Sequence, residues 1–228
     1  MSPRALLVAT LGLLASPAAA GVGTSSCPER SSWPREDWPS RVEATRASRS
    51  REIVALEQVL FRLEGEDADR KGIRSDAVLI VQGGAVVYER YGRGWDASHR
   101  HLTWSVSKSL MDALTGVAVR EGLLTLGGSV CGYVTDLPSA TCPITVAHLL
   151  EMASGLDWKE SYENESNRQS SVLAMLYGQG QADTGRFNAS HALRDPPGTA
   201  WRYSSGDTCT LSKVLGRVMR PRYGPSFR

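Results

Sequence analysis

The feature that most restricts the fold is a pair of β-rich segments joined by two glycines. Residues 77–82 (Ala-Val-Leu-Ile-Val-Gln) and 85–91 (Ala-Val-Val-Tyr-Glu-Arg-Tyr) flank Gly83 and Gly84. Two-residue hairpin loops use type I′ or II′ turns, whose positive φ angles glycine adopts without steric cost. The stretch therefore predicts an antiparallel β-hairpin. Because a lone hairpin is only marginally stable in water, the chain must bury it against other elements.

Helices are predicted on both sides of this hairpin, because apolar residues recur there with helical spacing. One helix starts near Ile53 and ends before Gly65, and a short one is expected over 169–177. Another starts after Thr145, a good N-cap, and stops before Gly155. The two longest patterns place apolar residues on one helical face at 110, 111, 114, 117 and 118, and at 211, 214, 215, 218 and 219.

The helix that follows the hairpin begins with a motif that has chemical use. Ser105 and Lys108 have the spacing S-x-x-K, which places both side chains on one face, one turn apart. A serine hydroxyl becomes a good nucleophile when a neighbouring base removes its proton, and a neutral lysine can be that base. Backbone N–H groups at the helix start can stabilise a developing oxyanion. The alternative is an ordinary N-cap serine with a solvated lysine, since the motif fixes only two positions.

Composition restricts the class of partner. The chain has 26 basic and 24 acidic residues, a formal net charge of +2, and no block of basic residues. This balance argues against a nucleic-acid partner. Hydrophobic residues at 41% and charged residues at 22% are typical of a globular chain and not of a disordered one.

The N-terminus has the pattern of a secretory signal. Arg4 precedes an apolar run over residues 5–15, and Ala18-Ala19-Ala20 fits a signal-peptidase site. Residues 1–20 are therefore predicted to be a cleaved signal peptide, which implies a secreted or periplasmic protein with no stable membrane span after cleavage. A short membrane anchor is the alternative reading of the same run.

Export makes the four cysteines candidates for disulfides. Cys131 and Cys142 bracket a short loop that contains a proline, so this pair is favoured, which leaves Cys27 for Cys209. No C-x-x-C or H-x-x-x-H spacing occurs, so no metal site is expected.

The order of these landmarks is similar to a known superfamily. The S-x-x-K motif is followed by His148-Leu-Leu-Glu-Met-Ala-Ser-Gly-Leu156, then Pro197-Gly-Thr and Tyr203-Ser-Ser-Gly-Asp-Thr. Over about residues 52–219 the chain resembles the serine β-lactamase and penicillin-binding-protein superfamily, within it the class C-like serine hydrolases, and most closely the aminohexanoate-dimer hydrolase type. The resemblance implies a β-lactamase/transpeptidase-like α+β fold, in which a helical region lies against an antiparallel sheet.

The resemblance also implies roles for individual residues. Ser105 would be the acylated nucleophile, Lys108 its proton acceptor, and Tyr203 a phenol that passes a proton to the leaving group. Whether Lys108, Tyr203 or the two together act as the base stays open at this point. Ser205 is a candidate substrate-binding residue, and it stands where the family's motif has Asn, which favours ester or amide substrates over lactams. Tyr162 is a candidate for lining the substrate cleft, and no cofactor is implied.

The resemblance further suggests how the chain is organised. After the signal peptide we expect an extended arm over 21–51, a β-lactamase-like domain over 52–219 and an irregular tail over 220–228. The family's remaining strands come from its C-terminal part, and no K-T-G or H-x-G strand motif follows Met219. The domain is therefore expected to lack those strands. Two functions follow: a serine hydrolase acting through an acyl-enzyme on a small or peptide-like substrate, or a non-catalytic remnant that retains only binding.

Overall fold

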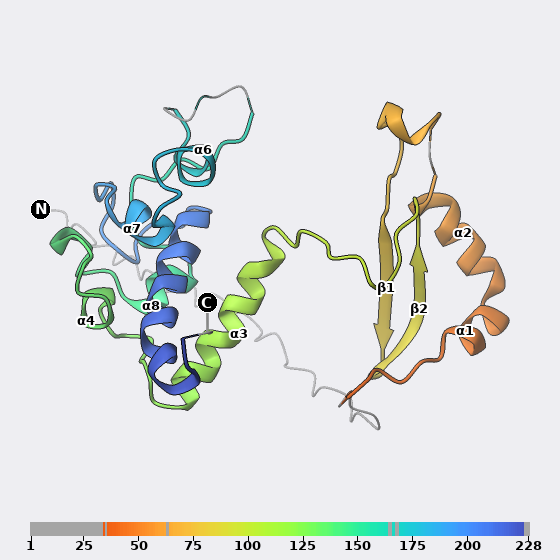
Figure 1. The fold of residues 1–228 in the computed structure, drawn as a ribbon, viewed down its shortest axis with the longest axis horizontal. Helices are drawn as coiled ribbons and strands as arrows, with labels where there is room; N and C mark the ends of the chain where they lie inside the picture. The colour runs from red at the N-terminus through yellow and green to blue at the C-terminus, as the bar shows by residue number, and fades with distance from the viewer. Residues whose placement is uncertain (1–33, 35, 63, 164–165, 167–168, 226–228) are drawn as a thin grey trace, which may run out of the picture. The chain divides into compact units, whose positions relative to one another are not determined.

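The computed structural model describes residues 34, 36–62, 64–163, 166 and 169–225 (Figure 1). These residues form two compact units, one ending at Arg100 and the other beginning at His101. The predicted signal peptide and Cys27 lie outside the described residues.

The predicted hairpin is present in the first unit. Strands β1 (Ala77–Gln82) and β2 (Ala85–Tyr91) pair antiparallel, with Ala77 opposite Tyr91 and Gln82 opposite Ala85. Gly83 and Gly84 have φ angles of 59° and 78°, and two positive values are what a type I′ turn requires. Helices together with a small antiparallel sheet confirm the α+β class.

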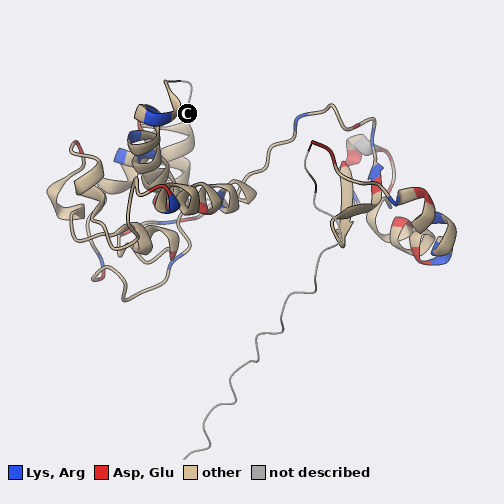
Figure 2. Ribbon diagram, turned by 90° about the horizontal axis from the view of Figure 1, so that it is seen from below, with Lys and Arg blue, Asp and Glu red and all other residues tan. Residues whose placement is uncertain are grey.

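Two helices lie beside β2 in this unit (Figure 1). Helix α2 (Ser50–Leu60) corresponds to the helix predicted from Ile53, and the 3₁₀ turn η1 (Asp67–Asp69) follows it. Helix α1 (Val42–Ser48) was not predicted, because the segment up to residue 51 was expected to be extended. It buries none of its residues, so its sequence lacks the apolar periodicity that marks a helix. Basic and acidic residues are interspersed along α1 and α2 (Figure 2).

The second unit is helical. Its helices are α3 (Val106–Arg120), α4 (Val130–Tyr133), α5 (Val146–Leu150), α6 (Ser171–Tyr177), α7 (Thr184–Ala189) and α8 (Ser205–Tyr223), with a 3₁₀ turn, η2 (Ser139–Thr141). Helix α8 packs against α3, α5 and α7. It buries four apolar residues at helical spacing, Leu211, Val214, Leu215 and Met219. These join Ala118, Val130, Ile144, Val146 and Leu149 in one core.

Two details of the helices differ from the sequence expectation. Leu110, placed on the buried face of α3 by its spacing, is 60% exposed, and the buried positions of that helix are Thr115 and Ala118. Helix α8 continues into the segment expected to be an irregular tail and ends at Tyr223, despite Pro221. Contacts with Glu121, just after α3, hold this last turn: the Tyr223 hydroxyl donates to Oε1 at 2.5 Å, and Arg222 Nε forms an ion pair with Oε2 at 2.9 Å.

The favoured disulfide is present. Cys131 and Cys142 are bonded, with their Cα atoms 5.1 Å apart, and they tie α4 to the loop before α5. Cys209 pairs with no cysteine in the part of the chain that the structure describes. Among the described helices, none is long and apolar enough to cross a membrane.

Candidate active site

The start of α3 brings the two residues of the S-x-x-K motif together. Ser105 occupies the N-cap position, yet its side chain makes no capping hydrogen bond. Instead, Lys108 Nζ donates to Ser105 Oγ at 3.0 Å. Ser105 is exposed and Lys108 half-buried, so the hydroxyl is accessible while the amine is partly sheltered. The geometry differs from that of an ordinary N-cap serine with a solvated lysine.

The backbone just before Ser105 is strained. Trp104 has a φ of +44°, a left-handed conformation that costs a residue with a Cβ roughly 1–2 kcal/mol. Among the described residues, the Ser105 amide N–H has no hydrogen-bond partner. It lies at the positive end of α3, so it is placed to donate to a negatively charged oxygen.

Tyr203 reaches the same hydroxyl from a distant loop. Its phenol donates to Ser105 Oγ at 2.6 Å, although 98 residues separate the two in sequence. The loop is fixed in place because Arg202 N donates to the carbonyl of Met152 at 3.0 Å, and Gly198 N to that of Ala153 at 2.7 Å. Ser105 Oγ therefore lies within hydrogen-bond distance of both an amine and a phenol.

Ser205, the first residue of α8, adds a further link. Its Oγ accepts a hydrogen bond from Lys108 Nζ at 3.1 Å and donates one to Glu160 Oε1 at 2.5 Å. Its backbone N–H donates to Glu160 Oε2 at 2.8 Å. Sequence reasoning missed Glu160, which belongs to a polar loop with no motif. The available signal was indirect: a helix that starts at Ser205 needs acceptors for its first N–H groups.

Two aromatic side chains also bind Glu160. The Trp158 indole donates to Oε2 at 2.6 Å, and the Tyr162 phenol donates to Oε1 at 2.7 Å. Partial burial and the hydrogen bond to Glu160 raise the pKa of Tyr162 to about 12, so its phenol keeps its proton at neutral pH. Tyr162 is 52% exposed, and its hydroxyl is linked to Ser205 through the carboxylate.

A second carboxyl group lies buried behind the site. Asp207 is 1% exposed and accepts hydrogen bonds from Ser154 Oγ (2.8 Å) and Asn188 Nδ2 (3.4 Å). Burial raises the pKa of Asp207 to about 6, against the pull of its hydrogen-bond donors. These contacts join the loop after α5 and helix α7 to the first turn of α8, next to Ser205.

Because Asp207 is buried, we expect the free energy of unfolding to fall as pH rises from about 4 to 7. The folded state holds the Asp207 proton more tightly than the unfolded state does, so the stabilisation is complete below the ordinary pKa of 3.8 and is lost as pH rises through about 6. The difference between a pKa of 3.8 and one of about 6 corresponds to about 3 kcal/mol in the free energy of unfolding. We expect Asp207→Asn to reduce this slope, measured by urea unfolding at several pH values. Equal slopes in the two proteins would contradict it.

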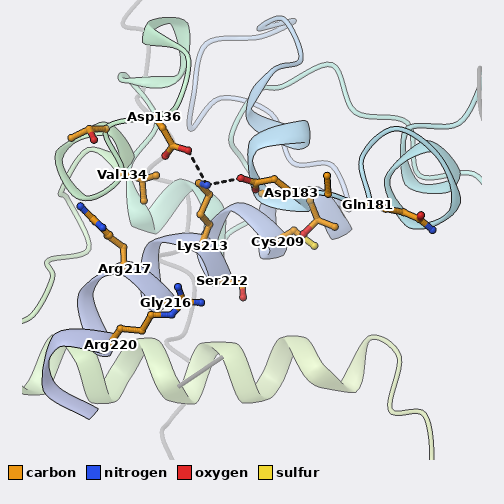
Figure 3. Close-up of a pocket in the computed structure, with 14 residues that line it drawn as sticks. Val134, Asp136, Gln181, Asp183, Cys209, Ser212, Lys213, Gly216, Arg217 and Arg220 are labelled. Carbon is orange, nitrogen blue, oxygen red and sulfur yellow. Dashed lines mark hydrogen bonds and ion pairs between the residues drawn. The ribbon is translucent and has the colours of Figure 1, made fainter. Parts of the chain in front are cut away.

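A cavity lies elsewhere in the helical unit (Figure 3). Its volume is about 600 Å³, and it lies along α8 between the segments around Asp136 and Asp183. Lys213 forms ion pairs with both carboxylates, at 3.1 and 2.6 Å. Ser105, Lys108, Tyr203 and Ser205 do not line it.

The histidine in the motif before Leu156 has a structural role. His148 completes a capping box at the start of α5: its N–H donates to Thr145 Oγ1, and its Nδ1 accepts from Thr145 N, both at 3.2 Å. Across the residues that the structure describes, no group of three or more His, Cys, Asp or Glu side chains could hold a metal ion.

Comparison with known proteins gives consistent matches. The family model described as Beta-lactamase matches residues 60–228. A 6-aminohexanoate-dimer hydrolase from Paenarthrobacter ureafaciens is 29% identical over 178 residues, which cover 75% of this chain and 45% of that protein. The structure of a putative 6-aminohexanoate-dimer hydrolase from Bacillus anthracis matches with a TM-score of 0.54 and 21% identity, covering 63% of this chain and 40% of that one. The chain thus spans less than half the length of these two relatives.

Proposed function

Since the chain belongs to the beta-lactamase family, we propose that it is a serine hydrolase that acts through an acyl-enzyme on Ser105. One observation carries the proposal: Ser105 Oγ lies 3.0 Å from Lys108 Nζ and 2.6 Å from the Tyr203 hydroxyl. A nucleophilic hydroxyl needs a proton acceptor, and the leaving group of the substrate needs a proton donor, each within about 3 Å.

Acylation uses these three groups in turn. The neutral amine of Lys108 takes the Ser105 proton as Oγ bonds to the substrate carbonyl carbon. The Ser105 N–H, which has no other partner among the described residues, stabilises the oxyanion. The tetrahedral intermediate then breaks its bond to the leaving group, which takes the phenolic proton of Tyr203. The products of this half-reaction are an acyl ester on Ser105, a lysine ammonium, a tyrosinate and the released amine or alcohol.

Deacylation returns the same protons. Water attacks the acyl ester and gives a proton to the Tyr203 oxygen. Ser105 Oγ then leaves with the proton held by Lys108, and the acid is released. The net reaction is hydrolysis of an amide or ester, and all three side chains return to their starting protonation states.

Ester and amide substrates fit this site better than lactams. At Ser205 the family's asparagine is replaced by a hydroxyl that already binds Lys108 and Glu160, so no side-chain amide is available there to bind a substrate. The disulfide supports a secreted or periplasmic location, where such bonds persist. The alternative is a non-catalytic remnant that retains only binding.

Covalent labelling tests the proposal. Purified protein is treated with a fluorophosphonate and, separately, with a labelled penicillin, and the adduct is located by peptide mass spectrometry. We expect one adduct per chain on Ser105 with the fluorophosphonate and a much slower reaction with the penicillin. Folded protein that forms no adduct, or an adduct at another residue, would favour the non-catalytic remnant.

Tyr203→Phe is expected to slow amide hydrolysis by about 10²-fold or more, because it removes the proton donor for the leaving group. The same substitution should have little effect on the acylation of Ser105 by a p-nitrophenyl ester, whose leaving group departs without a proton. Pre-steady-state acylation rates on matched amide and activated ester substrates measure the difference, because they exclude deacylation, in which Tyr203 also takes part. Equal losses on both substrates would show that Tyr203 does not act on the leaving group.

A further inference from the structure

We propose that Glu160 is a positioning residue that sets the direction of a hydrogen-bond chain through Ser205 and Lys108 to Ser105. The proposal rests on the proposed function and adds a residue that is linked to Ser105 only through Ser205 and Lys108. It concerns where the hydrogen atoms of the site point, which decides whether Lys108 can accept a proton.

The chain is continuous from the carboxylate to the nucleophile. Glu160 Oε1 lies 2.5 Å from Ser205 Oγ, which lies 3.1 Å from Lys108 Nζ. Lys108 Nζ lies 3.0 Å from Ser105 Oγ. Each separation is a hydrogen-bond distance, so each group faces its neighbour either as donor or as acceptor.

The carboxylate fixes these choices. A carboxylate only accepts hydrogen bonds, so the single hydroxyl proton of Ser205 must point to Glu160. Ser205 Oγ can then face Lys108 only as an acceptor, and Lys108 directs an N–H toward it. A neutral amine has a single lone pair, and this lone pair is then free to accept the Ser105 proton. Glu160 thereby makes Lys108 a donor on one side and an acceptor on the other.

Glu160 is itself held in one orientation. Oε2 accepts from the Trp158 indole (2.6 Å) and the Ser205 backbone N–H (2.8 Å), and Oε1 accepts from the hydroxyls of Tyr162 (2.7 Å) and Ser205 (2.5 Å). Trp158 is 6% exposed, and Ser205 N belongs to the first turn of α8. The two donors at Oε2 are therefore fixed N–H groups, whereas the two at Oε1 are hydroxyls that can rotate.

This difference makes Glu160→Gln an informative substitution. The amide oxygen of glutamine must take the Oε2 position, because the two N–H groups there need an acceptor. Its NH₂ group then faces the hydroxyls and donates to Ser205 Oγ. The Ser205 hydroxyl then donates its hydrogen bond to the lone pair of the Lys108 amine, so this lone pair can no longer accept the Ser105 proton. The direction of the hydrogen bonds is reversed, while the contacts of residue 160 with Trp158 and α8 remain.

The experiment is a double-mutant cycle on the rate of Ser105 acylation in the full chain. We measure labelling by fluorophosphonate and kcat and KM on an ester for the wild type, Glu160→Gln, Ser205→Ala and the double variant. Glu160→Gln is expected to lower the acylation rate and kcat by about 30-fold or more, with KM unchanged and a cooperative thermal transition retained. In the Ser205→Ala background the same substitution should change the rate by less than about 2-fold, because the link is gone.

The outcomes distinguish the role of Glu160 from the proposed serine hydrolase activity on which it rests. A wild type labelled on Ser105, with Glu160→Gln equally fast or with the same loss in both backgrounds, overturns the role of Glu160 and leaves the hydrolase intact. A wild type that forms no adduct overturns both. A rise in KM without a fall in kcat would place Glu160 in substrate binding and also overturn the proposal.

Discussion

Lys108→Met is expected to slow the acylation of Ser105 by about 10³–10⁴-fold. Methionine keeps an unbranched apolar side chain in the half-buried position but cannot take a proton, so Ser105 Oγ loses the base that lies 3.0 Å away. Loss of a positioned general base removes about 10²–10⁴-fold in rate, and loss of the hydrogen bond to Ser205 adds to this. The measurement is the pseudo-first-order rate of fluorophosphonate labelling.

Lys71→Met is the matched control for this change. Lys71 is exposed and belongs to the unit that ends at Arg100, so its replacement should leave the labelling rate within about 2-fold of wild type. If Lys108→Met reacts within 10-fold of the wild type, Lys108 is not the base, and Tyr203 becomes the candidate for that role.

Gly155→Ala is expected to destabilise the helical unit by about 2–5 kcal/mol. Gly155 has a φ of +79°, and a Cβ built there would lie 2.2 Å from the backbone oxygen of Asp195. The left-handed backbone costs an alanine about 1–2 kcal/mol, and overpacking costs about 1–3 kcal/mol more. The Gly155 carbonyl also accepts from Arg194 N (2.8 Å) and Asp195 N (3.1 Å), so the strain falls on the segment that leads to Tyr203. Urea unfolding measures the loss.

Gly216→Ala provides the comparison. Gly216 lies inside α8, and an added Cβ would meet nothing within 4 Å. Alanine is the better helix former by about 0.5–1 kcal/mol, so this variant should be as stable as the wild type or slightly more stable. If both substitutions cost the same, the close contact with Asp195 is not the cause.

Sequence reasoning succeeded where the signal was local. Gly83 and Gly84 define the hairpin turn by themselves, and Thr145 marks the start of α5 by its capping side chain. It failed for α1, whose residues are all at least partly exposed, and for the end of α8, which lies in the segment 220–228 that was expected to be irregular. In α8 the contacts of Arg222 and Tyr223 with Glu121 compensate, and these join residues about 100 positions apart.

The candidate site shows the same division. The S-x-x-K spacing alone placed Ser105 beside Lys108, whereas Tyr203 was identified only through the resemblance to a family. Glu160 could not be identified, because its role depends on the fold bringing it to Ser205, 45 residues further along the chain. A glutamate in a polar loop is most often solvated, and no spacing in the sequence distinguishes this one.

Ser105 and Tyr203 are carried by different segments: Ser105 is the N-cap residue of α3, and Tyr203 stands just before Ser204, the N-cap residue of α8. Their 2.6 Å contact is therefore only as well aligned as the packing of the two helices, which share a core with Ala118 at 0% exposure. A substitution that changes the size of a side chain in this core is expected to shift the Ser105 and Tyr203 oxygens before it unfolds the protein. Directed evolution of this chain toward new substrates should thus select changes deep in the helical core as readily as changes at its rim.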